Sequence, residues 1–254
     1  MNENPSNPLN RFSNRVNDYV KSRPSYPAEI MKFIVNDLGL EQSDKIADIG
    51  SGTGKFSELL LKNKNVVYCV EPNNEMRKAA EKLLSGYRNF ISINGEAENT
   101  GLDNNCVKFV TCAQAFHWFN HEKVKAEFLR ILIPDGWVIL IWNSRIIDST
   151  NFMKDYEELL LNFSIDYSQV NHKNIDERIL DRFFRNYKLK IFPYSQSFDF
   201  EGLKSRLLSS SYAPKEDHPK YRGMLDALEN IFNKNNVGGN VEFIYNSEVY
   251  FGKI

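Results

Sequence analysis

The sequence predicts an α/β fold of the Rossmann-like, doubly wound kind, in which helices cover both faces of a mainly parallel sheet. Short apolar runs alternate with helical patterns between residues 44 and 143. One of these runs, Ile46–Ile49, ends in glycines, and a helical pattern that contains Phe56 and Leu60 follows at once. The run from Trp137 to Trp142 is apolar throughout, as expected for a strand buried on both faces of such a sheet.

The segment Asp48–Gly54 predicts a nucleoside-binding turn between a strand and a helix. Its three glycines allow unusual backbone dihedrals and let a ligand approach the bare main chain. The following helix N-terminus offers unpaired N–H groups and a partial positive charge. Glu71 ends the next apolar run, and a carboxylate roughly 20 residues after such a turn suits the two ribose hydroxyls of a nucleotide-like ligand.

Two phosphate-binding motifs fit this turn less well. A dinucleotide fingerprint, G-x-G-x-x-G, would place its third glycine where the chain has Lys55. A P-loop, G-x-x-x-x-G-K-[ST], is one residue longer than Gly50–Gly54, and Phe56 replaces its hydroxyl residue. The remaining pattern, apolar-x-D-x-G-x-G-x-G with Glu71 downstream, resembles the first motif of class I S-adenosylmethionine (SAM) methyltransferases.

Further segments resemble the type 11 (UbiE-like) branch of these methyltransferases, and the similarity spans about residues 11 to 160. They are Arg23–Pro27, Gln114–Phe119, the helix with Glu127 and Arg130–Leu132, Pro134–Gly136 and Trp142-Asn143. Two positions depart from the family pattern: Lys108 stands where an Asp is frequent, and Asp135-Gly136 replaces a Gly-Gly turn. Neither position belongs to the glycine turn, so the expected fold and cofactor are unaffected.

The resemblance implies one methyltransferase domain over residues 1–254, with seven strands of which the last is antiparallel. Its expected parts are an N-terminal helical lid (9–40), a SAM-binding core (44–143), a helical insertion before strand six (144–187) and C-terminal strands and helices that complete the sheet (188–254). Apolar residues at helical spacing predict an amphipathic helix over Asn151–Phe163. The pattern farther on predicts strands over Lys188–Phe200 and Val241–Gly252.

The resemblance also implies which residues bind the cofactor SAM. Glu96, Ala97 and Glu98 match the family position at which a carboxylate and a backbone N–H contact the adenine. Arg23 is expected to pair with the methionine carboxylate. The predicted cofactor-binding residues are Arg23, Asp48, Gly50, Ser51, Gly52, Thr53, Glu71, Pro72, Met76, Glu96, Ala97, Glu98 and Gln114.

The aromatic segment after the fourth strand predicts the substrate side of the site. With aromatic residues of the N-terminal lid, the predicted substrate pocket consists of Tyr19, Tyr26, Phe116, His117 and Trp118. An alternative stays open for the N-terminal segment, which could simply cover one edge of the sheet.

Methyl transfer from SAM is an in-line displacement, and positioning alone can supply effective molarities of about 10⁵–10⁸ M. Phe116 or Trp118 could stabilise the sulfonium by a cation–π attraction of roughly 0.5–2 kcal/mol. His117 is the candidate catalytic base, because imidazole takes up a proton near neutral pH; the competing interpretation is that it packs between aromatic rings. We predict no metal site, since the other histidines lack metal-like spacing with acids or cysteines: His121, His172 and His218.

The composition limits the class of partner. A net charge of −1 and the lack of a basic patch argue against a nucleic-acid substrate, so a small-molecule acceptor is expected. The longest strongly apolar run is far too short to span a bilayer, and the N-terminus is rich in Asn and Pro instead of resembling a secretory signal. Three cysteines form no C-x-x-C pair. We therefore expect a cytoplasmic protein without membrane association; the pattern predicts no oligomeric state.

Two competing functions remain open beside methyl transfer to a small molecule. An NAD(P)-linked oxidoreductase shares the fold, but Lys55 at the third-glycine position and the lack of a Tyr-x-x-x-Lys pair argue against it. A non-catalytic SAM-binding or regulatory protein on the same fold is also compatible with the sequence, because a fold does not dictate a function.

Overall fold

A computed structural model describes residues 24–167 and 177–254, and its centre is a seven-stranded sheet in the order β3-β2-β1-β4-β5-β7-β6. The first five strands of this order, from β3 to β5, pair in parallel with their neighbours. Strand β7 is antiparallel to both β5 and β6. This confirms the predicted fold class with its antiparallel last strand. The strands are β1 Lys45–Ile49, β2 Val66–Val70, β3 Phe90–Ile93, β4 Val107–Ala113, β5 Leu132–Arg145, β6 Asn186–Phe198 and β7 Val241–Lys253.

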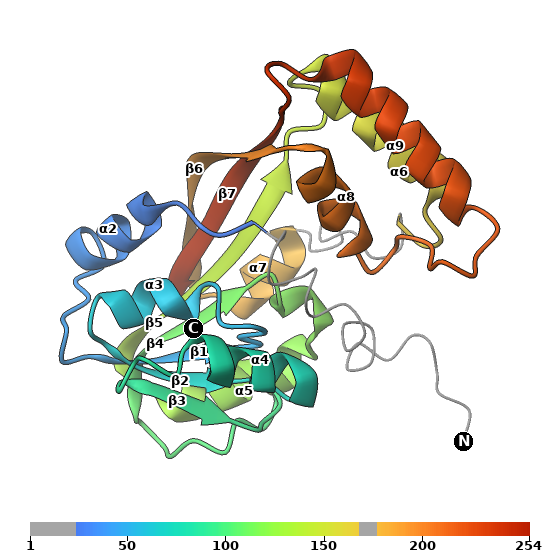
Figure 1. Cartoon of the computed structure of the whole chain (residues 1–254). Coiled ribbons are helices and arrows are strands. Elements are labelled where there is room, and N and C mark those ends of the chain that lie inside the picture. The colour runs from blue at the N-terminus through green and yellow to red at the C-terminus, as the bar shows by residue number, and fades with distance from the viewer. Residues whose placement is uncertain (1–23, 168–176) are drawn as a thin grey trace.

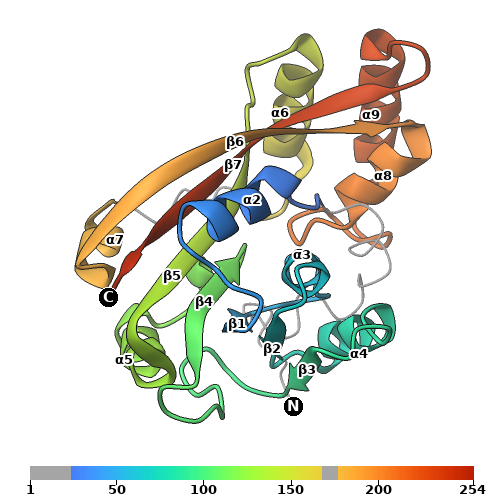
Figure 2. The same ribbon diagram turned by 90° about the vertical axis from the view of Figure 1, so that its left-hand side faces the viewer.

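Helices cover both faces of the sheet (Figures 1 and 2). In Figure 2, α5 and α7 lie on one side of the strands, and α3 and α4 lie on the other. Adjacent residues of β1 alternate between the two cores, since Ile46 packs with α2 and α3 whereas Ala47 packs with α5 and α7. The helices are α2 Ala28–Asn36, α3 Ser57–Lys62, α4 Asn74–Leu83, the 3₁₀ turn η3 Phe116–Trp118, α5 His121–Ile131, α6 Asn151–Phe163, α7 Glu177–Phe183, α8 Phe200–Leu208 and α9 Tyr221–Asn235.

A layer of three helices, α6, α8 and α9, stands beyond the carboxyl ends of the parallel strands (Figure 1). The long antiparallel pair of β6 and β7 extends out to this layer, which has an apolar core of its own around Tyr156, Leu203, Met224 and Phe243. Helix α6 has the predicted bounds, and Thr150 begins it by accepting a hydrogen bond from the Met153 backbone N–H at 3.1 Å. The layer therefore forms a roof over the edge where ligands bind in open α/β sheets.

Two predicted strand boundaries require correction, and part of one predicted segment falls outside the described residues. Strand six was predicted to reach Phe200, but Phe200 begins α8, because the Asp199 side chain caps that helix by accepting from the Gly202 N–H at 2.8 Å. Strand five is longer than predicted, since β5 includes the expected turn, at which Asp135 has a φ of 61°. The part of the predicted N-terminal lid before residue 24 lies outside the described residues, and the division of the chain into one domain with four parts stays a prediction. Among the described helices, none has the length and apolar character needed to cross a membrane.

Candidate functional site

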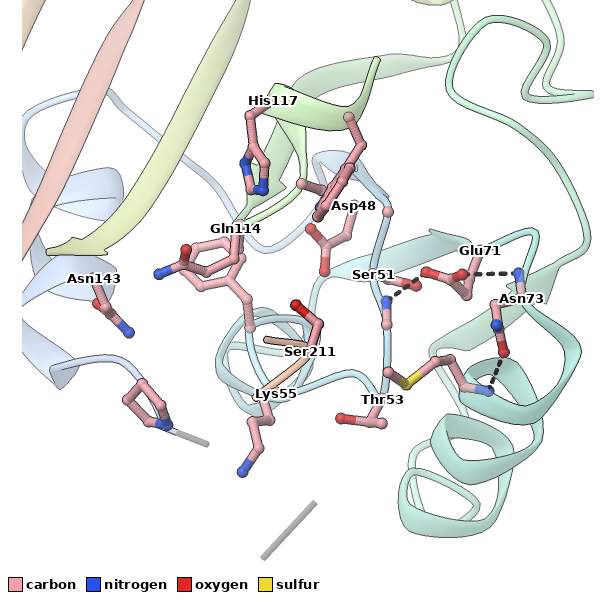
Figure 3. A pocket seen from close by; sticks show the side chains of 18 of the residues that line it. Asp48, Ser51, Thr53, Lys55, Glu71, Asn73, Gln114, His117, Asn143 and Ser211 are labelled. Carbon is pink, nitrogen blue, oxygen red and sulfur yellow. Dashed lines mark hydrogen bonds between the residues drawn. The ribbon is translucent and has the colours of Figure 1, made fainter. Parts of the chain in front are cut away.

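A cavity of about 400 Å³ lies between the carboxyl ends of β1, β2, β4 and β5 and the helical layer (Figure 3). It gathers segments that are far apart in sequence, from the glycine turn to β7. The predicted site residues that line it are Tyr26, Asp48, Gly50, Ser51, Gly52, Thr53, Glu71, Pro72, Met76, Glu96, Ala97, Glu98, Gln114, His117 and Trp118. Two predicted residues, Tyr19 and Arg23, lie outside the described part of the chain.

The glycine turn has the backbone geometry that its sequence indicates. Gly50, Gly52 and Gly54 all have positive φ values, of 67°, 57° and 82°. A Cβ atom at Gly50 would lie only 2.6 Å from the Cβ of Ala115, whereas a Cβ at Gly52 would meet nothing within 4 Å. The turn therefore needs glycine at position 50 for both space and dihedral angle, and Gly52 leaves its main chain open to a ligand.

Glu71 faces the turn from the end of β2, as Figure 3 shows. One carboxylate oxygen accepts from the Gly52 N–H at 2.9 Å, and the other accepts from the Asn73 N–H at 2.8 Å. Burial raises the pKa of Glu71, and these two backbone hydrogen bonds oppose the rise. The carboxylate is thus held in one orientation, with lone pairs left over for a ligand.

Asp48 lies beneath the turn and is only 1% exposed. Its two oxygens accept from the hydroxyls of Ser57, at the start of α3, and Thr111, on β4. Burial raises the pKa of Asp48 to about 6, although the bonds from Ser57 and Thr111 lower it and the nearby charge of Glu71 raises it further. Asp48 therefore fastens the turn to a helix and a strand and places a second acid beside the cavity.

Asp48 and Glu71 are the two buried acids of this half of the cavity, which Lys55, Glu96 and Glu98 also line. Among the described residues, neither Asp48 nor Glu71 forms an ion pair with a lysine or arginine. Buried carboxylates without a paired cation favour a positively charged ligand and disfavour a pyrophosphate.

The loop after β3 forms another wall of the cavity. Glu96 and Asn99 exchange backbone hydrogen bonds of 3.2 and 3.1 Å, and the Glu98 carboxylate accepts from the Asn120 N–H at 2.7 Å. Ala97, between the two acids, is buried and lines the cavity. These contacts hold the loop in the shape of a small hairpin with a backbone edge toward the cavity.

Glu127 on α5 anchors the end of that loop. One oxygen accepts from both the N–H and the hydroxyl of Thr100, at 2.8 and 2.6 Å, and Arg130 binds the carboxylate at 2.7 Å. Burial alone would raise the pKa of Glu127, but the bonds from Arg130 and Thr100 lower it to about 2. Glu127 and Arg130, which belong to the segments that resemble the family, therefore hold the loop after β3 against α5.

The aromatic segment after β4 is divided between cavity and core. His117 and Trp118 line the cavity. Phe116 does not, which corrects its predicted place in the substrate pocket: it is fully buried, stacks on His121 at 4.6 Å and meets Phe183 edge-on at 4.7 Å. Phe116 therefore supports the η3 turn from behind.

The position of the proton on His117 follows from one hydrogen bond. The Trp142 indole N–H donates to His117 Nδ1 at 3.3 Å. In the neutral ring the proton then resides on Nε2, so His117 acts as a hydrogen-bond donor at that atom. A base would need the lone pair that the indole already occupies.

The sequence does not predict the upper half of the cavity, the part beside the helical layer. Its lining comes from the end of β5, the helix α8, the segments that follow α6 and α8, and β7: Asn143, Arg145, Tyr167, Arg206, Ser211, Tyr212 and Tyr245. These residues form no motif, and they span about a hundred positions of the chain. The one available signal was an arginine, Arg206, between the apolar residues Leu203 and Leu207 of an amphipathic helix. Within residues 24–167 and 177–254, no group of three or more His, Cys, Asp and Glu side chains could hold a metal ion.

Known proteins with similar sequences are methyltransferases. Residues 47–140 match the family model of the type 11 methyltransferase domain. A methyltransferase-like protein of Schizosaccharomyces pombe is 28% identical over 224 residues, which cover 87% of this chain and 86% of the relative. A Mycobacterium bovis methyltransferase without an assigned substrate is 33% identical over 134 residues, or 53% of this chain and 52% of that protein.

Solved structures with the same fold support this assignment. A protein assigned as a type II methyltransferase of Anaeromyxobacter dehalogenans superposes with a TM-score of 0.64 at 14% identity, over 91% of this chain and 97% of its own. A protein assigned as a methyltransferase of an antibiotic biosynthesis pathway in Anabaena variabilis gives a TM-score of 0.61 at 21% identity, over 92% and 99%. At such low identity these two structures support the fold alone. Residues 47–140 are therefore similar to a type 11 methyltransferase domain, most of the chain is similar to a methyltransferase-like protein, and the fold is that of the two solved methyltransferase structures.

Proposed function

We propose that this chain binds SAM in the half of the cavity beside the glycine turn, the lower half. It transfers the methyl group of SAM to a small-molecule acceptor held in the half beside the helical layer, the upper half. The observation that carries the proposal is the pair formed across the glycine turn by Gly52 and Glu71. Both groups face a space that lies where open α/β sheets bind their ligands. The acids beside that space favour the cationic cofactor SAM over a dinucleotide.

Different residues of the lower half suit the ribose, the adenine and the methionine end of SAM. Each oxygen of the Glu71 carboxylate already accepts one backbone N–H, which leaves acceptor capacity for the two ribose hydroxyls. The buried edge of the loop at Ala97 and the side chain of Met76 suit an adenine ring. Gly50 and Gln114 line the remaining side, toward His117, and suit the methionine end of the cofactor.

The chemistry needs little acid–base assistance from the protein. When bound, SAM supplies a methyl group attached to a positively charged sulfur. The acceptor's electron pair forms the new bond to the methyl carbon, the carbon–sulfur pair returns to sulfur as a neutral thioether, and an acceptor that carried a proton at the reacting atom releases it. The face of Trp118 can stabilise the initial cation by roughly 0.5–2 kcal/mol.

His117 serves this reaction best as a donor. Because Trp142 occupies Nδ1, the proton on Nε2 can hold an acceptor oxygen or nitrogen at the cavity wall. Such positioning contributes through orientation of the reactants, a large term in two-substrate reactions. The role of catalytic base stays a prediction that the geometry does not favour.

The enclosure of the cavity supports a small acceptor. The helical layer lies above the strand ends, and residues of its segments, among them Arg206 and Tyr212, complete the lining. A volume of about 400 Å³ is in the range of small-molecule sites. A macromolecular substrate would need an open groove in place of this roof.

Isothermal titration with SAM, its product S-adenosylhomocysteine and NADH tests the proposal. We expect both sulfur compounds to bind with one site per chain and NADH to show no heat of binding. Incubation with SAM labelled on its methyl group, over a panel of metabolites, then identifies transfer. Preferential binding of NADH would overturn the assignment of the cavity, and binding of SAM without transfer to any acceptor would favour the regulatory alternative.

A further inference from the structure

The upper half of the cavity contains two arginines surrounded by tyrosines. Arg145 ends β5 and Arg206 lies on α8, and both line the cavity. Four tyrosines from α6, two connecting segments and β7 adjoin them, and we call the whole group the arginine–tyrosine cluster: Arg145, Arg206, Tyr156, Tyr167, Tyr212 and Tyr245. No other described cationic side chain in the molecule is as deeply buried as Arg206.

The charge of Arg145 is already matched within the protein. Its guanidinium forms an ion pair of 3.1 Å with Glu157 and donates to the hydroxyl of Tyr167, which donates in turn to Glu157. Its side chain is 11% exposed, and the other terminal nitrogen, Nη1, is buried without a hydrogen-bond partner in the described structure. Arg145 thus contributes an unused donor but no unbalanced charge.

Arg206, in contrast, carries a charge that no described acid balances. It is 4% exposed, and its guanidinium donates to the Tyr245 hydroxyl at 3.4 Å and to Ser210 Oγ at 3.2 Å. No oxygen of a described Asp or Glu lies within ion-pair distance of it, so neutral oxygens are its only described hydrogen-bond partners. Arginine does not lose its proton in proteins, so the chain cannot relieve this buried charge by deprotonation. A buried, unpaired guanidinium that faces a cavity indicates an anionic ligand.

We propose that Arg206 binds a carboxylate of the methyl acceptor, so that the substrate class of this enzyme is a small carboxylic acid. One unbalanced positive charge matches a carboxylate, whereas a phosphate dianion would leave negative charge in excess. The planar guanidinium also matches a carboxylate through two parallel hydrogen bonds. This inference rests on the proposed function, because it assigns the cluster to the acceptor of the same reaction.

A second donor of the cluster suits the same ligand. Arg145 lines the cavity, and its Nη1 is buried without a hydrogen-bond partner in the described structure. Aromatic side chains, including Tyr245 and Tyr167, form the cavity walls beside it. The subsite thus combines donors for one carboxylate with apolar ring surfaces for a short carbon skeleton.

Calorimetry on the whole chain tests this assignment. The protein, with and without saturating S-adenosylhomocysteine, is titrated with a panel of mono- and dicarboxylic acids of two to ten carbons, with the methyl ester of each acid, and with inorganic phosphate. We expect at least one acid to bind tenfold more tightly than its ester and more tightly than phosphate. Failure of every acid to bind, equal binding of acid and ester, or tighter binding of phosphate would overturn the proposal, and these titrations use the unchanged protein alone.

A pair of variants then assigns the effect to Arg206. Arg206→Met keeps the length of the side chain and its packing on Phe243 but removes the charge. We expect it to weaken binding of the acid at least tenfold, with the Kd for SAM changed less than twofold and the melting temperature of the ligand-free protein unchanged or higher. The control is Lys204→Met on the same helix, which removes a charge outside the cavity and should change neither affinity. Unchanged binding of the acid by Arg206→Met would refute the role of this residue.

The outcomes for the two proposals are distinguishable. Absence of SAM binding by the unchanged protein would contradict the proposed function, while the titrations without S-adenosylhomocysteine still report on the carboxylate subsite. Binding of SAM together with absence of carboxylate binding would contradict only the inference about Arg206.

Discussion

Replacement of Glu71 by alanine is the most direct test of the cofactor site, because its expected effect follows from the hydrogen bonds of one side chain. A carboxylate offers about four lone pairs to donors. Two are used by the N–H groups of Gly52 and Asn73, at 2.9 and 2.8 Å, which leaves two for the ribose hydroxyls. The side chain is 8% exposed, so water competes weakly for these positions.

The magnitude follows from the free energy of such bonds. A hydrogen bond to a charged group contributes about 1.5–3 kcal/mol, and water that enters the space in the variant recovers part of the loss from two of them. We therefore expect Glu71→Ala to weaken SAM binding by about 1–3 kcal/mol, or roughly 5- to 150-fold in Kd. Stability should change less, because removal of a buried carboxylate also removes the burial cost that raises its pKa.

The assay is isothermal titration of the variant with SAM, beside a control variant. Glu75→Ala removes an exposed carboxylate four residues away, in the first turn of α4, and should bind SAM like the unchanged protein. Glu71→Gln provides a second comparison, since its amide can accept only one of the two backbone N–H bonds. An affinity of Glu71→Ala within twofold of the unchanged protein would refute the assignment of Glu71 to the ribose.

Three other predictions concern the turn and the aromatic segment. His117→Ala should lower kcat at least tenfold, because a hydrogen-bond donor to the acceptor is lost, while the Kd for SAM should stay within twofold. Steady-state kinetics measures the first effect and calorimetry the second; a kcat equal to that of the unchanged protein would show that His117 takes no part in the reaction. Asp48 has a pKa raised from 3.8 to about 6, so the folded state binds the proton more tightly, and ionisation of Asp48 lowers the stability of the protein as the pH rises from 4 to 7. In urea unfolding, the stability of Asp48→Asn relative to the unchanged protein should therefore increase by up to roughly 3 kcal/mol over that range. A difference in stability that stays constant with pH would contradict this. Gly50→Ala should lower the melting temperature more than Gly52→Ala, since both strain the backbone by about 1–2 kcal/mol but only the first meets the Ala115 Cβ at 2.6 Å; equal losses would be inconsistent with this packing.

The parts of the site that the sequence predicted are those determined by local geometry. Glycine readily adopts the positive φ values found at Gly50 and Gly52. Strands β1 and β2 are parallel neighbours, so Glu71, which follows β2, lies at the same edge of the sheet as the turn that follows β1. The parallel pairing of β1 with β2 and β4 also follows from the alternation of strands and helices, because parallel neighbours need long crossover connections. Most predicted cofactor residues therefore line one cavity, although their contacts with SAM stay a prediction.

The parts that could not be predicted depend on contacts between distant segments. Phe116 and His117 are neighbours in a one-turn 3₁₀ helix, and only the tertiary packing decides that Phe116 is buried while His117 faces the cavity. Likewise, the indole N–H that fixes the proton of His117 comes from Trp142, on the next strand. The sequence around Arg206 does not indicate that α8, which follows strand β6 of the antiparallel β6–β7 pair, lies over the cavity.

The cavity joins two halves of opposite charge, and they have different origins. The family model ends at residue 140, so it includes the turn, Glu71 and His117 and stops before Arg145 and Arg206. The half inside the family domain contains the buried acids Asp48 and Glu71, whereas the half outside it contains Arg206, whose charge no described acid balances. Under the proposed function, the acids would orient a cationic cofactor and Arg206 an anionic acceptor, so that each ligand would lie in its own half of the cavity. The residues that select the acceptor would then lie outside the stretch that matches the family model, in and beside the helical layer.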